Sequence, residues 1–466
     1  METEMDDLEQ TNGQQRLFGT DGVRGTANRE PMAPDVIYNL GRAAGYVFGK
    51  IGTDTVLVGR DGRLSGDMLE CALVAGLCSV GISVCRVGIV PTPAIAHLTG
   101  VLSAQLGVMI SASHNPFEHN GVKFFKADGT KIDDDLEQEI EAAYFGRAHL
   151  SVNPTGGAIG RVVERMNVVD RYLHHVEQTV PRGFDLSGLT IVVDCANGAS
   201  SQTTPRLLQH FGAEVVTIHD MPNGRNINEA CGSQHTEPLA KAVAAHLADL
   251  GVAHDGDADR AIFVDERGNR LDGDHILAIC GPHLKDLGRL HGDVVVTTVL
   301  GNFGLDLTLN PLGIRVARSK VGDRLVWEEM RNIGASLGGE QAGHVIFAEF
   351  SSTGDGLITA LQVLDAMESS GKPLSELRRR LIVIPQTTRD IEVPAKPPLE
   401  DFPTIQQAID RASTTLADPA KAGRVIVRYS GTEPLARVMI EGENEEQINA
   451  LADEIAEAIR EAICEH

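Results

Sequence analysis

A polar loop, ISASHNP, directly follows the apolar run at 106–110. Serine and asparagine are ordinary turn formers, so the loop could be no more than a polar turn. Ser113 is also a candidate nucleophile. However, the loop lacks the glycines of a serine hydrolase elbow, and in an extended segment the ring of His114 would point away from the hydroxyl. A phosphoryl group carried by Ser113 and held by Asn115 and Lys123 suits these residues better than a hydrolase triad.

Three carboxylates stand at alternate positions in HDGDADR: Asp255, Asp257 and Asp259. A solvated acidic turn is one interpretation, but crowded carboxylates repel one another unless a cation neutralises them. An EF-hand would need glycine at its sixth position, where Arg260 stands, and the following AIFVD predicts a strand. Because oxygen ligands select Mg²⁺ or Ca²⁺, we predict a Mg²⁺ site with one position open to a phosphate oxygen and Arg260 beside it.

A glycine-rich loop, LGGEQAGHVIF, contains Glu340 and His344 four residues apart. A carboxylate among glycines can accept hydrogen bonds from two adjacent hydroxyls of a sugar. A Glu and a His satisfied within the core are the alternative. Arg24 in FGTDGVRG and Lys320 in RSKVGDR place two further cations beside glycines.

A second candidate anion site lies in RYSGTEPLAR. Ser430, Gly431 and Thr432 predict a tight turn whose backbone N–H groups can bind an anion, with Arg428 and Arg437 flanking it. A hairpin turn with two surface arginines is the alternative.

Three βαβ units are predicted to position most of these loops. β-branched runs begin at Thr55, Thr190 and Val294, and each is followed by a polar or glycine-containing turn and a helix-length stretch. A glycine then leads a second strand: GISVCRV, GAEVVTI and GIRVARS. This order predicts three similar α/β domains with mostly parallel sheets, in which ligands bind beyond the carboxyl ends of the strands.

The last part of the chain has a different pattern. The strands RVIVRYS and ARVMIEG and two helical stretches predict a small α+β domain, and the final helix places Ile448, Leu451, Ile455 and Ile459 on one stripe. We predict domains at 1–162, 163–268, 269–384 and 385–466, with the serine, aspartate, sugar and phosphate loops in that order.

Composition limits the class of protein. The 466 residues are 42% hydrophobic and 23% charged, which is typical of a soluble globular protein, and no apolar run is long enough to cross a bilayer. The start, METEMDDLEQTNGQQ, predicts a disordered lead-in instead of a signal peptide. Seven cysteines without a C-x-x-C pair indicate reduced thiols in a cytoplasmic protein. The net charge of −24 argues against nucleic acid and membrane partners, so an anionic substrate would need a local basic site.

Taken together, the motifs resemble those of the α-D-phosphohexomutase superfamily. FGTDGVRG, ISASHNP with NGVKFF, DGDADR, GGEQAGH and RYSGTEP occur in its order and spacing, from about residue 16 to about residue 440. The resemblance implies four domains around a central cleft, three of them mixed-sheet α/β domains and the fourth α+β. The sequence departs from the family pattern at two positions. It has Ala342 where the family usually has serine, and Tyr429 where the family usually has lysine.

The resemblance also implies residue roles. Ser113 would be a phosphoserine whose phosphate ligates one Mg²⁺ with the three aspartates. Lys123, Arg24, His114 and His344 would be catalytic, with His344 and Lys123 as candidates to accept a proton. The implied substrate-binding residues are Arg260, Lys320, Glu340, Gln341, Arg428, Ser430, Gly431, Thr432 and Arg437.

The implied reaction converts glucosamine 6-phosphate into glucosamine 1-phosphate through a hexosamine 1,6-bisphosphate that is both intermediate and activator. The expected partner is a small sugar phosphate, and a homodimer is the expected assembly. Three alternatives stay open: a phosphomannomutase or phosphoglucomutase, a non-catalytic sugar-phosphate-binding protein, and a serine hydrolase.

Overall fold

The computed structural model describes residues 10–11, 14–19, 21–50, 55–165, 168–416, 423–430 and 434–464. The chain forms two compact units, one made of Met1–Val299 with Ala317–Arg379 and the other of Leu300–Val316 with Arg380–His466. The predicted disordered lead-in lies mostly outside the described residues, and its described parts, β1 (Gln10–Thr11) and β2 (Gln14–Gln15), pair antiparallel. The boundaries predicted at 163, 269 and 385 stay a prediction.

A six-stranded sheet in the first unit carries the Ser113 loop. Its strand order is β3-β7-β6-β4-β5-β8, in which β4, β5, β6 and β8 are parallel and β3 and β7 pair antiparallel. The strands are β3 (Val23–Thr26), β4 (Thr55–Arg60), β5 (Ser83–Ile89), β6 (Leu106–Ile110), β7 (His119–Lys126) and β8 (Val162–Glu164).

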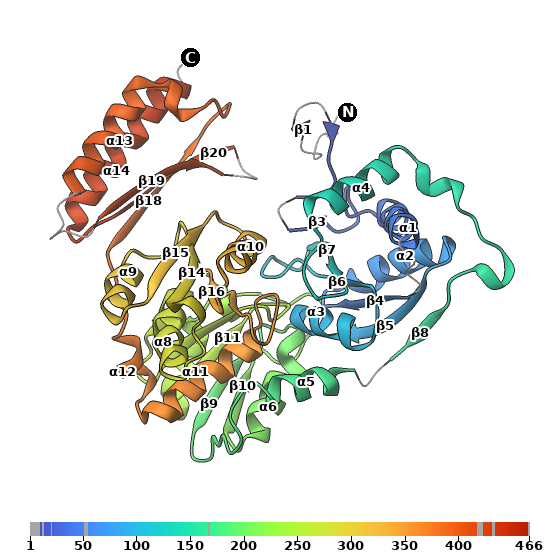
Figure 1. Ribbon diagram of the computed structural model, residues 1–466, viewed down its shortest axis with the longest axis horizontal. Helices are drawn as coiled ribbons and strands as arrows, with labels where there is room; N and C mark the ends of the chain where they lie inside the picture. Colours follow the sequence, from blue (N-terminus) through green and yellow to red (C-terminus); the bar gives the residue numbers. More distant parts are fainter. Residues whose placement is uncertain are drawn as a thin grey trace. The chain divides into compact units, whose positions relative to one another are not determined.

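Helices cover both faces of this sheet (Figure 1). α1 (Pro34–Lys50), α2 (Gly66–Ser79) and α4 (Asp134–Phe145) share a core with alternate strand residues such as Val56 and Val58. α3 (Thr92–Val101) packs on β4 and β6, on the face to which Gly107 belongs. That contact requires glycine, because a Cβ at Gly107 would lie 2.2 Å from Thr99 Oγ1.

The second sheet carries the aspartate loop. Its order is β10-β9-β11-β12-β13, with β9, β10 and β11 parallel and β12 and β13 antiparallel. The strands are β9 (Thr190–Asp194), β10 (Glu214–Ile218), β11 (Leu250–His254), β12 (Ala261–Asp265) and β13 (Arg270–Leu271). The helices are α5 (Val169–Glu177), α6 (Thr204–His210) and α7 (Glu237–His246).

The third sheet carries the loop that contains Glu340. β14 (Val294–Thr298) pairs parallel with β16 (Leu337–Gly339), which pairs antiparallel with β17 (Val345–Phe347), and β15 (Arg315–Ser319) is the strand beyond β14. The helices of the first unit here are α8 (Gly273–Asp286), α10 (Asp323–Ile333), α11 (Gly356–Ser370) and α12 (Leu374–Arg378). No helix among the described residues has the length and apolar character needed to cross a membrane.

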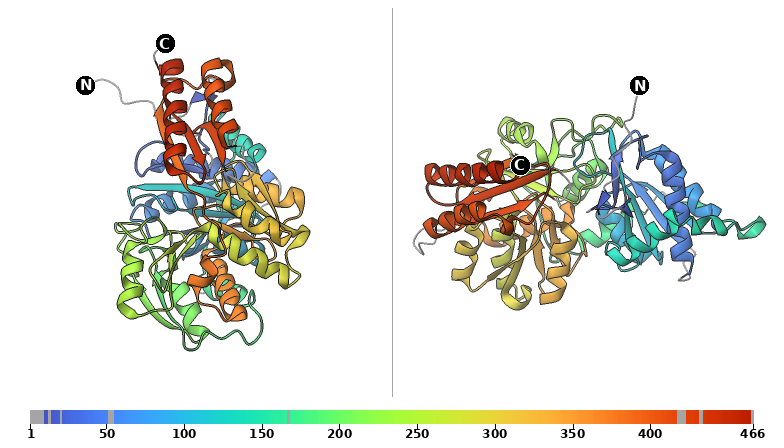
Figure 2. Two further views of the ribbon diagram at one scale, coloured as in Figure 1. Left: turned by 90° about the vertical axis from the view of Figure 1, so that its left-hand side faces the viewer. Right: turned by 90° about the horizontal axis from the view of Figure 1, so that it is seen from above.

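The second unit contains α9 (Gly304–Leu309) and a three-stranded antiparallel sheet in the order β18-β20-β19. Its strands are β18 (Gln386–Glu392), β19 (Arg424–Tyr429) and β20 (Leu435–Glu441). α13 (Pro403–Leu416) and α14 (Glu445–Ile459) pack against each other and against this sheet (Figures 1 and 2). The stripe predicted on the last helix is confirmed, because all four of its residues are buried.

The predicted βαβ units are also confirmed. Strands begin at Thr55, Thr190 and Val294, and the second strands follow as β5, β10 and β15. Gly81 and Gly212 precede two of these second strands with φ of 93° and 92°, a left-handed conformation that favours glycine. The fold class is therefore the predicted one, with mixed α/β sheets and a C-terminal α+β part.

Candidate active site

Ser113 lies just after β6, a strand buried along its whole length. Its Oγ donates a hydrogen bond of 2.6 Å to Asp255 Oδ2, and its backbone N–H donates to Ser111 Oγ at 2.9 Å. The backbone of Ser113 is left-handed, with φ of 51°, which for a residue other than glycine costs about 1–3 kcal/mol and is common at functional sites. The predicted loop therefore presents its hydroxyl directly to the predicted metal loop.

The prediction that the His114 ring points away from Ser113 is wrong. The ring Nδ1 lies 3.3 Å from Ser113 Oγ, because the left-handed backbone at Ser113 makes the segment a turn and not an extended strand. Burial, followed by the charges of Arg260 and Arg24, lowers the pKa of His114 to about 4. His114 is therefore neutral at physiological pH and lies beside the serine.

Two residues that the sequence did not single out hold the Ser113 loop. Arg63 is fully buried, pairs with Asp61 at 2.9 Å, and donates to the backbone carbonyls of Ser113 and Asn115 at 2.8 and 2.9 Å. Asn228 Nδ2 donates to the same two carbonyls at 2.9 and 3.0 Å. Arg63 follows β4 as the motif loops follow their strands, and this position is the one signal that could have identified it.

The three aspartates lie between β11 and β12, and all are buried. One carboxylate oxygen from each lies within 4.8 Å of the others. Oδ1 of Asp257 and Oδ1 of Asp259 are buried and have no hydrogen-bond partner among the described residues, and Thr92 Oγ1 donates to Asp257 Oδ2 at 2.6 Å. Burial, with the two neighbouring carboxylates, raises the pKa of Asp255 well above its usual range. Converging oxygens that lack donors fit a bound cation, so these residues form a candidate metal site.

Glycine lets the aspartate loop approach the serine loop closely. A Cβ at Gly256 would lie 2.8 Å from the carbonyl oxygen of Ser113. Any larger residue would force the two loops apart, so Gly256 contributes to the short contact between Ser113 and Asp255.

Lys123 and Arg260 bring positive charge to the aspartates. Lys123 Nζ is buried and lies 3.2 Å from Asp257, 3.9 Å from Asp259 and 3.4 Å from Asp21. Burial lowers the pKa of Lys123, but Asp21 and Asp257 outweigh that effect and raise it, so the ammonium stays charged. Arg260 Nε is buried, lies 3.8 Å from both Asp255 Oδ2 and Asp259 Oδ1, and makes no hydrogen bond within the part of the chain that the structure describes.

An ion-pair chain missed by the sequence interpretation extends from this cluster. Asp21 pairs with both Arg24 and Lys131, and Lys131 also pairs with Asp323 at the start of α10. Burial raises the pKa of Asp323, but Lys131 outweighs that effect and lowers it. The ion pair with Asp21 therefore places Arg24 near the aspartate cluster.

His344 connects the sugar-loop strands to the aspartates. Its Nδ1 lies 3.6 Å from Asp259 Oδ2, and its Nε2 accepts a hydrogen bond of 2.9 Å from the Gly354 N–H. Burial lowers the pKa of His344, but Asp259 outweighs that effect and raises it. Because Gly354 makes Nε2 the acceptor, the neutral ring carries its proton on Nδ1, facing Asp259.

The predicted sugar loop is formed, but only part of it is tied to the cluster. Glu340 joins β16 to β17 and accepts a hydrogen bond of 3.2 Å from the Gly322 N–H, and burial raises its pKa. Lys320 is exposed and Gln341 is half-buried. No hydrogen bond or ion pair within the described ranges links either side chain to Ser113.

The second unit places the two predicted arginines opposite each other. Arg428 of β19 is in register with Arg437 of β20, and burial, together with the charge of Arg437, lowers the pKa of Arg428. Arg437 also lies 3.3 Å from Asp390. Like charges on facing residues destabilise a sheet, and a bound anion would relieve that cost.

The turn after Arg428 is partly described. Lys396 Nζ, a cation missed by the sequence interpretation, donates to the Ser430 carbonyl at 2.8 Å. The predicted contributions of Gly431 and Thr432 fall outside the described residues.

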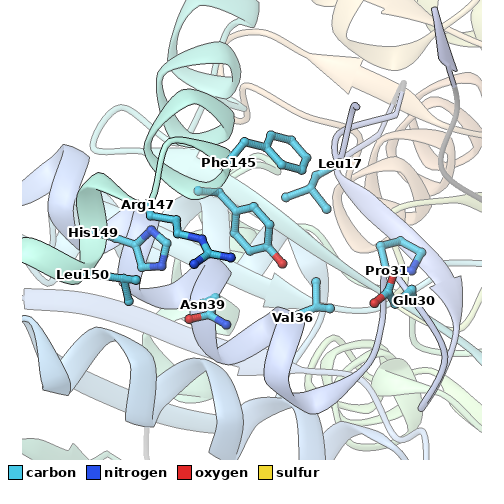
Figure 3. Close-up of a pocket in the computed structure, with 10 residues that line it drawn as sticks. Leu17, Glu30, Pro31, Val36, Asn39, Phe145, Arg147, His149 and Leu150 are labelled. Atoms are coloured by element: carbon cyan, nitrogen blue, oxygen red, sulfur yellow. The ribbon is translucent and has the colours of Figure 1, made fainter. Parts of the chain in front are cut away.

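A cavity of about 450 Å³ lies elsewhere on the first unit (Figure 3). Side chains of α1, such as Val36 and Asn39, and of the segment after α4, such as Arg147 and His149, line it. Its lining contains none of the predicted site residues, so the cavity is separate from the candidate active site.

Known families match all four parts of the chain. Residues 15–150, 170–268 and 272–383 match phosphoglucomutase/phosphomannomutase α/β/α domains I, II and III, and residues 390–458 match the C-terminal domain of the same family. The order of these matches agrees with the predicted order of three α/β domains and one further domain.

Relatives and solved structures agree over nearly the whole chain. The phosphoglucosamine mutase of Syntrophotalea carbinolica is 48% identical over 95% of this chain and 97% of its own. That of Desulforudis audaxviator is 50% identical over 96% and 98%. A phosphoglucomutase/phosphomannomutase family protein from Burkholderia thailandensis superimposes with a TM-score of 0.79 at 25% identity, over 96% of this chain and 97% of its own. A Thermus thermophilus putative phosphomannomutase shares the fold with a TM-score of 0.75 at 23% identity, over 95% and 98%. The chain therefore belongs to the phosphoglucomutase/phosphomannomutase family of the α-D-phosphohexomutase superfamily and is a phosphohexomutase.

Proposed function

We propose that this phosphohexomutase interconverts glucosamine 6-phosphate and glucosamine 1-phosphate in the cytoplasmic synthesis of amino-sugar nucleotides. The observation that carries the choice of substrate is its identity of 48% and 50%, over 95% and 96% of the chain, to relatives named phosphoglucosamine mutase. The reaction class is supported by Ser113, whose Oγ lies 2.6 Å from one of three buried aspartates.

In this proposal Ser113 carries the phosphoryl group. The sugar O1 forms a bond to phosphorus as the bond to Ser113 Oγ breaks and that oxygen takes up a proton, which gives the 1,6-bisphosphate. The sugar then reorients, and Ser113 Oγ forms a bond to the phosphorus at position 6 as the bond from that phosphorus to O6 breaks and O6 takes up a proton. The proton of the serine hydroxyl must leave in that second transfer, and Asp255 Oδ2 already accepts its hydrogen bond.

Positive charge around the phosphoryl group supplies most of the catalysis, because phosphoryl transfer depends on positioning and charge neutralisation. Lys123 is a buried cation at the aspartates, Arg260 is a half-buried one, and Arg24 approaches through Asp21. One Mg²⁺ per chain, held by the aspartates, would withdraw further charge from the phosphoryl oxygens when bound. The unpartnered oxygens of Asp257 and Asp259 support that assignment.

His344 is the proposed acceptor of the sugar hydroxyl proton, at Nε2, which would have to give up its hydrogen bond from the Gly354 N–H to do so. Lys123 is the weaker candidate, because Asp21 and Asp257 keep its ammonium charged. His114 is neutral beside Ser113 and is proposed to orient the serine and its phosphate.

The remaining predicted residues are proposed to bind the rest of the substrate. Glu340, Gln341 and Lys320 would contact the sugar, while the stationary phosphate would bind the loop of the second unit, namely Arg428, Ser430, Gly431, Thr432 and Arg437. Arg428 and Arg437 carry like charges at facing strand positions, which supports a role in binding an anion. A homodimer stays a prediction.

Coupled assays with three substrates test the proposal. We expect kcat/KM for glucosamine 6-phosphate to exceed the values for mannose 6-phosphate and glucose 6-phosphate. A preference for mannose or glucose phosphate would assign the chain to the alternative mutases, and tight binding of all three without turnover would make it a non-catalytic binding protein.

A further inference from the structure

Three side chains of metal-ligand type meet outside the active site, at the end of the second sheet. Asp194 ends β9, His219 directly follows β10, and Cys231 precedes the short helix η4 (Gly232–Gln234). Because β9 and β10 are parallel, with Ile218 in register with Asp194, the next residue along β10 lies beside the carboxylate. One ligand atom from each of the three side chains lies within 4.8 Å of the others.

The carboxylate of this cluster is fixed by backbone donors. Asp194 is fully buried, its Oδ1 accepts from the Ala196 N–H and its Oδ2 accepts from the Gly232 N–H, both at 2.9 Å. A carboxylate oxygen that accepts one hydrogen bond keeps a second lone pair. Asp194 can therefore ligate an ion without releasing the backbone.

The imidazole faces the same point. His219 Nδ1 is buried and lies 3.1 Å from Asp194 Oδ1, which is its nearest charged group among the ion pairs of the described residues. The proximity of the Asp194 carboxylate raises the pKa of His219. The side chain of His219 is 31% exposed, whereas Cys231 is fully buried, so the cluster is open to water on the histidine side.

We propose that Asp194, His219 and Cys231 bind a divalent transition-metal ion of the zinc class, with water in the fourth position. Oxygen, nitrogen and sulfur donors together suit Zn²⁺ and Co²⁺, whereas Mg²⁺ selects oxygen alone. This site is separate from the three aspartates proposed for Mg²⁺.

The charges around the cluster favour a cation. Asp194 and Glu229 act on Cys231, and Asp194 and Asp220 act on His219. Burial, together with Asp194 and Glu229, raises the pKa of the Cys231 thiol to about 12, so the thiol is protonated before an ion binds. Coordination breaks the S–H bond, and the proton passes to solvent as the sulfur–metal bond forms.

The site closes the base of a loop that supports the catalytic serine. Residues 219–231 leave the sheet at His219, return at Cys231, and carry Asn228, which donates to the carbonyl oxygens of Ser113 and Asn115. An ion held by both ends of this loop would limit its opening. We therefore expect the metal to stabilise residues 219–231, which support the Ser113 loop, without contacting substrate.

Metal binding by the full-length chain, with Mg²⁺ present in excess to fill the aspartate site, tests the proposal. After removal of bound metal and dialysis against Zn²⁺, wild type should retain one zinc ion per chain. Co²⁺ should give the near-ultraviolet thiolate-to-metal absorption band. Cys231→Ser and His219→Gln should each weaken zinc binding by more than about tenfold and Cys231→Ser should abolish the band, because even outer-shell changes cost about that much.

Two controls locate the ion. Cys85→Ser, a change of another buried thiol, and Asp257→Ala, which damages the proposed Mg²⁺ site, should both leave zinc retention and the cobalt band intact. His219→Gln changes a partly exposed side chain, so it tests the site even if Cys231→Ser fails to fold. Absence of retained zinc and of the band in wild type would overturn the proposal, and so would equal retention by wild type and His219→Gln.

Discussion

Replacing Arg63 by alanine removes the buried cation that holds the Ser113 loop. The guanidinium pairs with Asp61, and both side chains are fully buried. It also donates to the backbone carbonyls of Ser113, Asn115 and His119 at 2.8, 2.9 and 3.0 Å. The change therefore removes the cation that pairs with Asp61 and one hydrogen-bond donor from each of these carbonyl groups.

The expected loss of unfolding free energy follows from these contacts. Breaking a buried ion pair by removing one partner costs about 3–5 kcal/mol. The carbonyls of Ser113 and Asn115 keep their hydrogen bonds from Asn228, so they add little. Burial already raises the pKa of Asp61, against the pull of Arg63. Without Arg63, Asp61 would bind a proton more readily when folded than when unfolded, so the stability of the variant should fall as pH rises.

A matched variant separates this effect from the general loss of an arginine. Arg206 pairs with Asp170 at 2.7 Å, but the side chains are 62% and 58% exposed, so Arg206→Ala should cost about 0–1 kcal/mol. Urea denaturation of both variants, followed by circular dichroism, gives the comparison. If Arg63→Ala unfolds within about 1 kcal/mol of Arg206→Ala, the loop does not depend on the buried cation.

Three further predictions concern the metal, the sugar loop and a buried carboxyl group. Chelation should stop turnover reversibly and Asp257→Ala permanently, as measured before and after Mg²⁺ is restored; activity without metal would make the aspartates structural. Glu340→Ala should damage steady-state turnover far more than Ala342→Ser, which should change KM for glucosamine 6-phosphate by no more than about tenfold; a switch of hexose preference in Ala342→Ser would refute the glucosamine assignment. Burial raises the pKa of Glu137 to about 7, so folding favours its protonated form, and that contribution to stability is lost as pH rises from its unfolded value through 7. In Glu137→Gln, the free energy of unfolding measured in urea should change less with pH across this window. An unchanged pH dependence would show that Glu137 does not cause it.

Much of the scaffold was predictable because its signals are local. β-branched runs and the glycines that begin the second strands mark β4, β5, β9 and β10, and the period of the last helix marks its buried face. The resemblance to the superfamily also implied that the aspartates would lie near Ser113. Their contact at 2.6 Å agrees with that prediction.

The support for the site could not be predicted from local pattern. Arg63 and Asn228 reach Ser113 from 50 and 115 residues away, and the turn-forming residues around each of them do not indicate a contact so distant in sequence. The orientation of His114 depended on one left-handed residue, which alternation in a strand does not anticipate. The roles assigned to Lys320 and Gln341 rest on resemblance and stay predictions.

The mass of Ser113 after reaction tests the central claim most directly. The purified chain is incubated with a hexose 1,6-bisphosphate and Mg²⁺, and its intact mass and peptides are then compared with those of Ser113→Ala. We expect one phosphoryl group on the peptide that contains Ser113, its transfer to glucosamine 6-phosphate when that sugar is added, and none on the variant. Turnover by Ser113→Ala, or a phosphoryl group on another residue that is passed to the sugar, would contradict the proposed mechanism.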